Sequence, residues 1–180
     1  FLNLTPDHLD KYGTMERYAE SKAMMLDMME KDSYSVLNMD DEKVSSYEGR
    51  VKGDLLWFTR QRETKSGAYV KDGKVYFAHN GKEEYIIDIC DICLMGNHNL
   101  ENVLSAVCMT YIMGVDAKVI RDTLMSFKGV EHRLEPVGTF NGITYINDSK
   151  GTNTDAAITA IKAMERPTVL IAGGYDKGSE

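Results

Sequence analysis

Apolar residues along this chain recur with two different spacings. Short runs of β-branched and aromatic residues predict strands, and apolar residues that repeat every three to four positions predict amphipathic helices. Gly, Pro, Asp-Gly and Asn-Gly separate these runs. The pattern as a whole predicts a mixed α/β fold. Strands are expected at residues 1–4, 36–38, 55–60, 67–72, 74–79, 84–88, 144–146 and 168–172, and helices at about 15–30, 95–113, 116–127 and 154–163.

Four of these strands crowd into residues 54–88. Lys65-Ser66-Gly67, Asp72-Gly73 and Asn80-Gly81 separate them. Asp-Gly and Asn-Gly are the strongest short hairpin signals, because both positions of a tight hairpin turn need a positive φ. A small antiparallel meander with a structural role is therefore expected here.

The helix expected at residues 15–30 carries a lysine on its apolar side. Met15, Tyr18, Met25 and Met29 recur at the spacing of one helical face, and Lys22 occupies the position between Tyr18 and Met25. One explanation is a lysine whose stem covers apolar surface while its ammonium reaches water. The other is that Lys22 points into a site as a modified or metal-linked group.

The stretch YINDSKGTNTD, residues 145–155, predicts a short buried strand, a polar loop and a helix for which Asn153, Thr154 and Asp155 are good caps. The strand is expected to be the second of a hairpin that turns at Asn141-Gly142. In an open α/β sheet, ligands bind beyond the carboxyl ends of strands, where helix N-termini present free N–H groups. An ordinary capped loop explains the same residues. The strand expected at 168–172 ends in a second loop, 173–178, which carries Lys177. If the two lysine-bearing loops share one edge of a parallel sheet, a functional role is favoured.

Two further polar groups are candidates for binding. Asp7, His8 and Asp10 follow the first expected strand and suit a divalent cation or a phosphate, although a solvated loop histidine is the simpler interpretation. The helix that begins near residue 95 has an amide-rich first turn. Its polar residues suit a planar heterocycle or helix capping alone, and they are Asn97, His98, Asn99 and Asn102.

Composition narrows the class of protein. The net charge is −7, from 21 basic and 28 acidic residues, and no basic stretch interleaved with aromatic residues is present, so nucleic acid is not an expected partner. No apolar run is long enough to span a bilayer, and no membrane insertion is expected.

Three cysteines favour a reducing compartment, the cytoplasm. Cys90 and Cys93 form a C-x-x-C without a second pair, so buried inert thiols are expected rather than zinc or redox chemistry. The chain begins without Met, inside an expected strand, which suggests a piece of a longer protein.

Four stretches occur in an order that resembles the Mur ligases of peptidoglycan synthesis: LNLTPDHLDKYGTMERYAESK, GNHNLENVLSA, GVEHRLEPVGTFNGITYINDSKGTNTDA and VLIAGGYDKG. The NDSK-x-TN block with the GG-x-DKG loop resembles the branch that adds D-glutamate. Gly151 departs from the Ala that the family usually has. The block disfavours a folate polyglutamylating ligase of the same superfamily. The alternative to any ligase is a binding or structural module without catalytic activity.

The resemblance implies a fold and a reaction. Residues 1–131 would be the later part of a central ATPase domain that includes the meander, and residues 132–180 the start of a Rossmann-like C-terminal domain that admits the amino acid. ATP would phosphorylate the carboxylate of UDP-N-acetylmuramoyl-L-alanine, and the amine of D-glutamate would attack the acyl phosphate. A monomeric, magnesium-dependent, cytoplasmic enzyme is implied. The chain contains no G-x-x-x-x-G-K-[ST] phosphate loop, so it is not expected to be active by itself.

The resemblance also implies roles for individual residues. His8 and Lys22 would bind magnesium, with Lys22 carbamylated, and Lys150 would approach the phosphates. These three residues are the expected catalytic group. The nucleotide would be bound by Asn99, Asn102, Arg133 and Asp148, and the other substrates by Asp7, Thr152 and Lys177.

Overall fold

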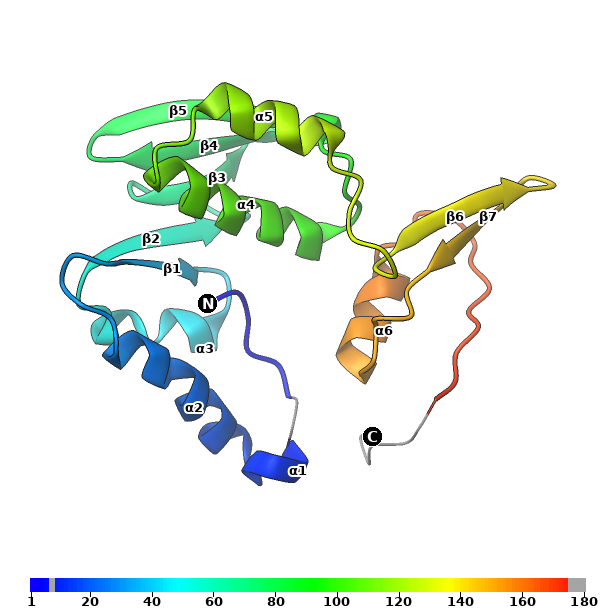
Figure 1. Cartoon of the computed structure of the whole chain (residues 1–180), viewed down its shortest axis with the longest axis horizontal. Helices are drawn as coiled ribbons and strands as arrows, with labels where there is room; N and C mark the ends of the chain where they lie inside the picture. Colours follow the sequence, from blue (N-terminus) through cyan, green and yellow to red (C-terminus); the bar gives the residue numbers. More distant parts are fainter. Residues whose placement is uncertain (7–8, 175–180) are drawn as a thin grey trace.

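The structure is a computed structural model that describes residues 1–6 and 9–174. Asp7, His8 and Lys177, three of the predicted site residues, lie outside the described residues. Figure 1 shows the elements in chain order. They are α1 (Leu9–Tyr12), α2 (Met15–Asp27), β1 (Tyr34–Asn38), α3 (Glu42–Ser45), η1 (Glu48–Arg50), β2 (Asp54–Thr59), β3 (Gly67–Lys71), β4 (Lys74–His79), β5 (Lys82–Asp88), η2 (Ile89–Asp91), α4 (Asn97–Ile112), α5 (Ala117–Ser126), β6 (Glu135–Phe140), β7 (Ile143–Asn147) and α6 (Thr154–Lys162). The α/β class expected from the sequence is confirmed.

The larger sheet has the strand order β1-β2-β3-β4-β5. The prediction of a separate four-stranded antiparallel meander is wrong, because β2 pairs in parallel with both β1 and β3, and only β3, β4 and β5 are antiparallel. The reason lies in residues 60–66, which return the chain to the start of β2 instead of making a hairpin. The Trp57 N–H donates to the Ser66 carbonyl at 2.9 Å. Gly67 follows with φ +125°, and a Cβ there would lie 1.8 Å from the Trp57 carbonyl oxygen, so only glycine fits.

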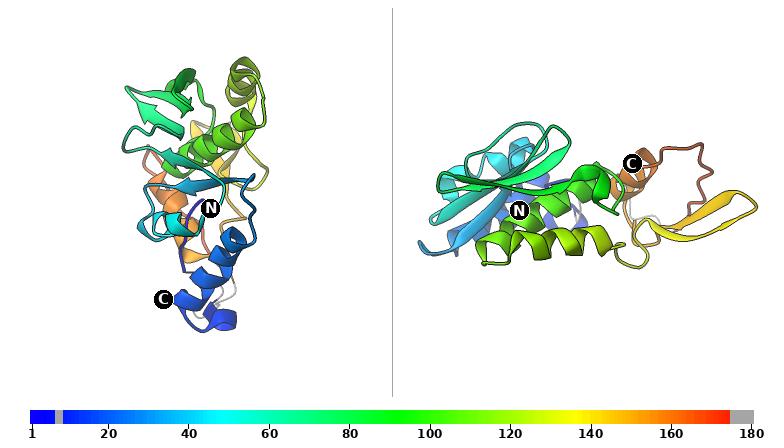
Figure 2. Two further views of the ribbon diagram at one scale, coloured as in Figure 1. Left: turned by 90° about the vertical axis from the view of Figure 1, so that its left-hand side faces the viewer. Right: turned by 90° about the horizontal axis from the view of Figure 1, so that it is seen from above.

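Helices cover both faces of this sheet. On one face, α4 and α5 lie side by side, as Figure 2 shows, and bury a core that includes Leu56, Phe58 and Leu104. On the other face, α2 and α3 bury a second core with Leu26 and Leu37. The two cores form because alternate residues of a strand point to opposite faces. The first part of the chain is therefore a three-layer α/β unit.

The buried face of α2 differs from the predicted one. Its buried residues are Tyr18, Ala19, Ala23 and Leu26, whereas Lys22 is exposed. The larger methionines suggested a stripe through position 22, but Met24 and Met25 are exposed, and the small alanines are buried in their place. Lys22 is therefore not on the apolar face, and its ammonium lies 5.3 Å from the centre of the Tyr18 ring.

Residues 1–4 form no regular strand, contrary to the prediction. The segment is nevertheless extended alongside β1, where the Asn38 N–H donates to the Phe1 carbonyl at 3.2 Å. The Asn38 amide also donates to the Leu2 carbonyl at 2.9 Å, and Leu4 is buried in the second core. The first segment thus joins the edge of the sheet through few hydrogen bonds.

The second part of the chain is small and open. Strands β6 and β7 pair as a hairpin through Asn141-Gly142, both with positive φ, as the sequence predicts. The helix α6 begins where expected, because the Asn153 side chain accepts the Ala156 N–H at 2.7 Å. However, no described residue from 131 to 174 is buried, and within that range residues 168–172 form no strand. The strand predicted at 144–146 is confirmed as β7, but its predicted burial and the predicted parallel sheet are wrong.

The cysteines divide differently from the prediction. Cys90 and Cys93 are exposed, whereas Cys108, on the inner face of α4, is buried in the first core. Cys90 and Cys93 lie in and just after η2, where the neighbouring Ile89, Ile92 and Leu94 pack against the first core instead. Among the described residues, no helix is long and apolar enough to cross a membrane.

Candidate functional site

The amide-rich turn predicted near residue 95 is the N-terminal end of α4. Gly96, with φ +89°, precedes the helix and provides no side-chain cap. The Asn99 side-chain amide donates to the Met95 carbonyl at 2.7 Å, and the Asn102 amide donates to the Asn99 side-chain oxygen at 3.4 Å. The first backbone N–H groups of the helix are therefore not capped by a residue from the preceding turn.

A second polar group is built where residues 131–135 meet the loop 147–151. The Asp148 carboxylate accepts the Leu134 N–H at 3.0 Å, and the Lys150 N–H donates to the His132 carbonyl at 3.0 Å. These bonds bring the predicted residues Arg133, Asp148 and Lys150 together from separate segments. Arg133 would lie far from Asp148 and Lys150 in an extended chain, so the hairpin β6–β7 is what brings it to them.

Three residues of this junction were not predicted as site residues. The side chains of His132 and Asn147 approach to 2.9 Å, and the Glu135 carboxylate accepts the His132 N–H at 2.8 Å. His132 and Leu134 both have positive φ, at 67° and 43°. Such backbone costs free energy, and the bonds from Glu135 and Asp148 hold it in place. The only feature of the sequence that pointed to these three residues was their place in two polar stretches, EHRLEP and YINDSK.

The loop after β7 depends on glycine at position 151. A Cβ there would lie 2.6 Å from the Asp148 carboxylate oxygen. The departure from alanine noted in the sequence therefore has a structural consequence here, because Gly151 lets the Asp148 side chain fold back over its own loop. Beyond it, the Thr152 N–H donates to the Lys150 carbonyl at 2.9 Å, and both side chains are exposed.

His98 lies where α4 approaches the second polar group. Burial lowers the pKa of His98, the Glu101 and Asp148 carboxylates act in the opposite direction, and Arg133 adds to the lowering. Asp148 and Arg133 are thus close enough to α4 to act on its first turn. Figure 1 shows the N-terminal end of α4 on the side of the first part that faces the hairpin β6–β7 and α6.

Lys22 is not part of this group. It lies on α2, which packs on the other face of the sheet from α4. Its predicted partner in binding magnesium, His8, is outside the described residues, as are Asp7 and Lys177. The described residues therefore contribute one expected metal ligand, an exposed amine.

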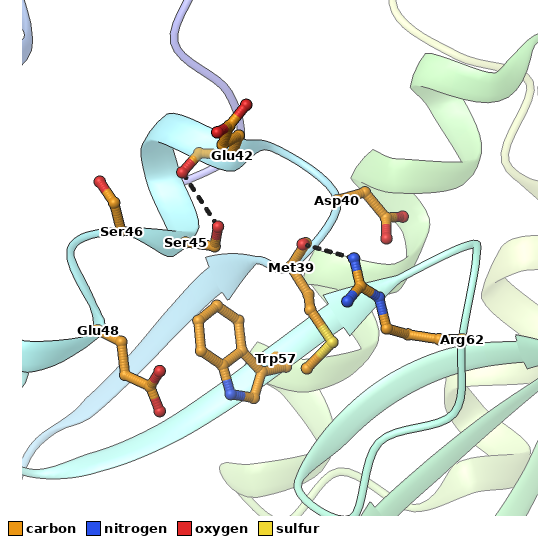
Figure 3. A pocket seen from close by; sticks show the side chains of 8 residues that line it. All are labelled: Met39, Asp40, Glu42, Ser45, Ser46, Glu48, Trp57 and Arg62. Carbon is orange, nitrogen blue, oxygen red and sulfur yellow. Dashed lines mark hydrogen bonds between the residues drawn. The ribbon is translucent and has the colours of Figure 1, made fainter.

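A separate cavity of about 630 Å³ opens at the carboxyl ends of β1 and β2, and Figure 3 shows its lining. It contains none of the predicted site residues. The Arg62 guanidinium donates to the Met39 carbonyl at 3.4 Å beside the Trp57 indole. The Asp40 carboxylate accepts from the Thr59 hydroxyl and the Arg60 N–H, each at 2.6 Å, so its oxygens already have partners.

One small group of potential metal ligands occurs in the described part of the chain. Asp88, Cys90 and Asp91 have ligand atoms within 4.8 Å of one another. Two of the three are exposed, and Lys74 lies 3.7 Å from Asp88. The group lacks the fourth enclosed ligand of a structural zinc site.

The fold defines a class of protein, a three-layer α/β unit followed by a smaller hairpin-and-helix unit that meets the N-terminal end of α4. Residues 1–110, more than half of the chain, match the Mur ligase middle domain. The chain therefore belongs to the Mur ligase family.

Individual relatives agree with this assignment. The chain is 50% identical, over 99% of its length, to the UDP-N-acetylmuramoylalanine--D-glutamate ligase of Thermoanaerobacter sp. (strain X514), and it spans 39% of that protein. The MurF structure from Acinetobacter baumannii matches with a TM-score of 0.72 and 16% identity, over 90% of this chain and 36% of that one. MurF ligase from Thermotoga maritima, solved in complex with ADP, matches with a TM-score of 0.63 and 20% identity, over 89% and 37%. The two structures support the fold alone.

Proposed function

We propose that the complete protein containing this chain is a cytoplasmic, monomeric, ATP-dependent ligase that joins D-glutamate to UDP-N-acetylmuramoyl-L-alanine. The relatives that are similar over nearly the whole chain carry the name of that activity. The structural observation that supports the proposal is that Asp148 and Arg133 act electrostatically on His98, in the first turn of α4 beside Asn99. Amide, carboxylate and guanidinium groups at one place suit the base, the ribose and the phosphates of a nucleotide. The bound ADP of the Thermotoga maritima relative supports a nucleotide as the ligand.

Each residue of this junction has a distinct part in the proposal. Asn99 and Asn102 bind near the adenine base, since amides pair with the donors and acceptors of a heterocycle. Asp148 binds the ribose hydroxyls, and Arg133 the ribose or the phosphates. Lys150 approaches the phosphoryl group that is transferred, where an ammonium stabilises developing negative charge.

The chemistry then runs in two steps. The terminal phosphoryl group of ATP passes to the carboxylate of the sugar-peptide, and ADP is released. The amine of D-glutamate attacks the acyl carbon, an amide bond forms and inorganic phosphate leaves. Thr152 and Lys177 are proposed to hold the carboxylates of D-glutamate, and Asp7 to contact the substrate, so that the amine is oriented for attack.

Magnesium and a carbamylated lysine belong to the same proposal. The Lys22 amine is exposed, so carbon dioxide has access to it. Carbamylation would replace its positive charge with an anionic oxygen pair, which is the kind of ligand that magnesium binds. Lys22 and His8 would then hold the ion. When bound, magnesium would neutralise charge on the phosphate oxygens.

The test is a ligase assay on the complete protein with ATP, magnesium, UDP-N-acetylmuramoyl-L-alanine and D-glutamate. Phosphate release that requires both carbon substrates is expected. Turnover of a folate and glutamate instead, or of neither pair, would contradict the proposal. The 180-residue chain alone is the control, and it should release no phosphate because it contains no phosphate loop.

Substitution Lys22→Ala in the complete protein should abolish turnover, because a methyl group cannot be carbamylated. Short carboxylic acids added to the assay should restore part of it by replacing the missing anion. Lys43→Ala is a matched control, since Lys43 is another lysine whose ammonium lies beside a tyrosine ring, that of Tyr47. Unchanged activity in Lys22→Ala would show that Lys22 is only a surface residue.

A further inference from the structure

The two parts of the chain touch at a specific point beside the proposed nucleotide site. A Cβ added to Gly96 would lie 2.9 Å from His98 Cε1 and 3.0 Å from the Ala163 methyl group. Gly96 directly precedes α4, and Ala163 caps the C-terminal end of α6. The His98 ring and the C-cap residue of α6 therefore lie against the same small residue.

The contact has a favourable electrostatic direction. The N-terminal end of a helix carries partial positive charge and the C-terminal end partial negative charge. Here the N-terminal end of α4 meets the C-terminal end of α6, so the two helix ends attract each other. The described residues from 131 to 174 have no buried core of their own, so a local contact of this kind has more influence on their placement than it would in a packed domain.

Burial, more than the charged groups around His98, favours an uncharged ring. Glu101 faces it from α4, Asp148 from the loop after β7, and Arg133 from the segment before β6. Glu101 is already paired with Arg60 at 2.8 Å. Burial of the ring lowers the pKa of His98. The ring therefore acts through its shape and packing.

We propose that His98 is a positioning residue: its ring, packed against Gly96 beside Ala163, fixes the hairpin–α6 unit on the end of α4. In this way it sets the spacing between the Asn99 and Asn102 amides and the Arg133–Asp148 pair. The inference rests on the proposed function, because it assigns His98 a part in assembling the nucleotide site. It gives His98 no contact with the reacting atoms.

Two readouts on the complete protein separate this inference from the proposed function. Spin labels at cysteines placed at Lys118 on α5 and Val137 on β6, with Cys90 and Cys93 changed to serine, report the distance between the units without any substrate. Steady-state kinetics report the KM for ATP and kcat. His98→Ala should broaden the distance distribution, raise the KM for ATP about tenfold and change kcat at saturating ATP less than threefold. His98→Gln, neutral and of similar reach, should lie closer to the parent protein in both readouts.

Two further variants complete the test. Gly96→Ala should act like His98→Ala, because the added methyl group occupies the space that His98 and Ala163 now share. Lys162→Ala, next to Ala163 but exposed, is the matched control and should leave both readouts unchanged. An unaltered distance distribution in both His98→Ala and Gly96→Ala would overturn the inference. A broadened distribution in a protein that does not use ATP would preserve the positioning role and reject the proposed function.

Discussion

The two parts of this chain contain similar apolar patterns but bury them to very different extents. In residues 1–126, a five-stranded sheet is covered on both faces, and side chains such as Phe58 and Leu104 are fully buried. In residues 131–174, a hairpin and one helix form, yet Ile158 on α6 is 42% exposed and Val137 on β6 is 61% exposed. The difference shows that a strand or helix can be determined locally, whereas its burial requires partner elements.

Local signals explain why the open part still has defined elements. Asn141 and Gly142 supply the two positive φ values of a tight hairpin turn, and Asn153 caps α6 through its own side chain. Hydrogen bonds of Asp148 and Glu135 then fix the junction. A polar site can therefore be organised in a part of the chain that lacks a hydrophobic core.

The rates at which the three cysteine thiols react provide the strongest test of the packing in the first part. Burial raises the pKa of Cys108 to about 12, from an ordinary 9.0, which lowers its thiolate fraction about a thousandfold. In the folded chain, Cys90 and Cys93 should react quickly with a thiol reagent at pH 8, and Cys108 should react only when the chain is unfolded. The measurement is the number of thiols modified with time, with and without guanidinium. If all three thiols reacted at one rate in the folded chain, the burial of Cys108 between α4 and the sheet would be contradicted.

Because the two parts differ in burial, shortening an apolar side chain to alanine should affect the free energy of unfolding more in the first part than in the second. Leu104→Ala in the core should lower the free energy of unfolding of the 180-residue chain by about 2–5 kcal/mol, because it removes buried methyl groups and leaves a cavity. Ile158→Ala, on the half-exposed face of α6, should lower it by about 0.5 kcal/mol. Urea unfolding measures both. Equal losses would mean that α6 is packed in solution as tightly as α4.

The sequence predicted the helices and strands themselves better than it predicted which strands pair with each other. The turn at Asn141-Gly142, the helices α4, α5 and α6 and the strands β1–β7 were found from spacing and caps, which act within a few residues. The parallel pairing of β2 was missed, because it depends on how residues 60–66 return the chain to the start of that strand. The strand expected at 168–172 needs a neighbouring strand, and the described chain offers none there.

The site was predictable in part for the same reason. Arg133, Asp148 and Lys150 come from stretches that resemble a known family, and the hairpin brings them together. His132 and Glu135 were not identified, and His98 was noted only as part of an amide-rich first turn, because their roles depend on contacts between segments that the linear sequence does not reveal. Lys22 was singled out by an argument that proved wrong, since the alanines of α2 rather than its methionines face the sheet. Its proposed role therefore depends on the family resemblance alone.

The central claim is that both parts of the chain contribute to one nucleotide site, and substrate-specific kinetics of the complete protein test it most directly. Asn102→Ala, from the first part, and Asp148→Ala, from the second, should each raise the KM for ATP about ten- to a hundredfold, the loss expected for a hydrogen bond worth about 1.5–3 kcal/mol. The KM for D-glutamate should change far less. Lys177→Ala is the opposite control, which should raise the KM for D-glutamate and leave that for ATP nearly unchanged. If Asp148→Ala and Lys177→Ala raised the KM of the same substrate equally, the assignment of a nucleotide site to this junction would be contradicted.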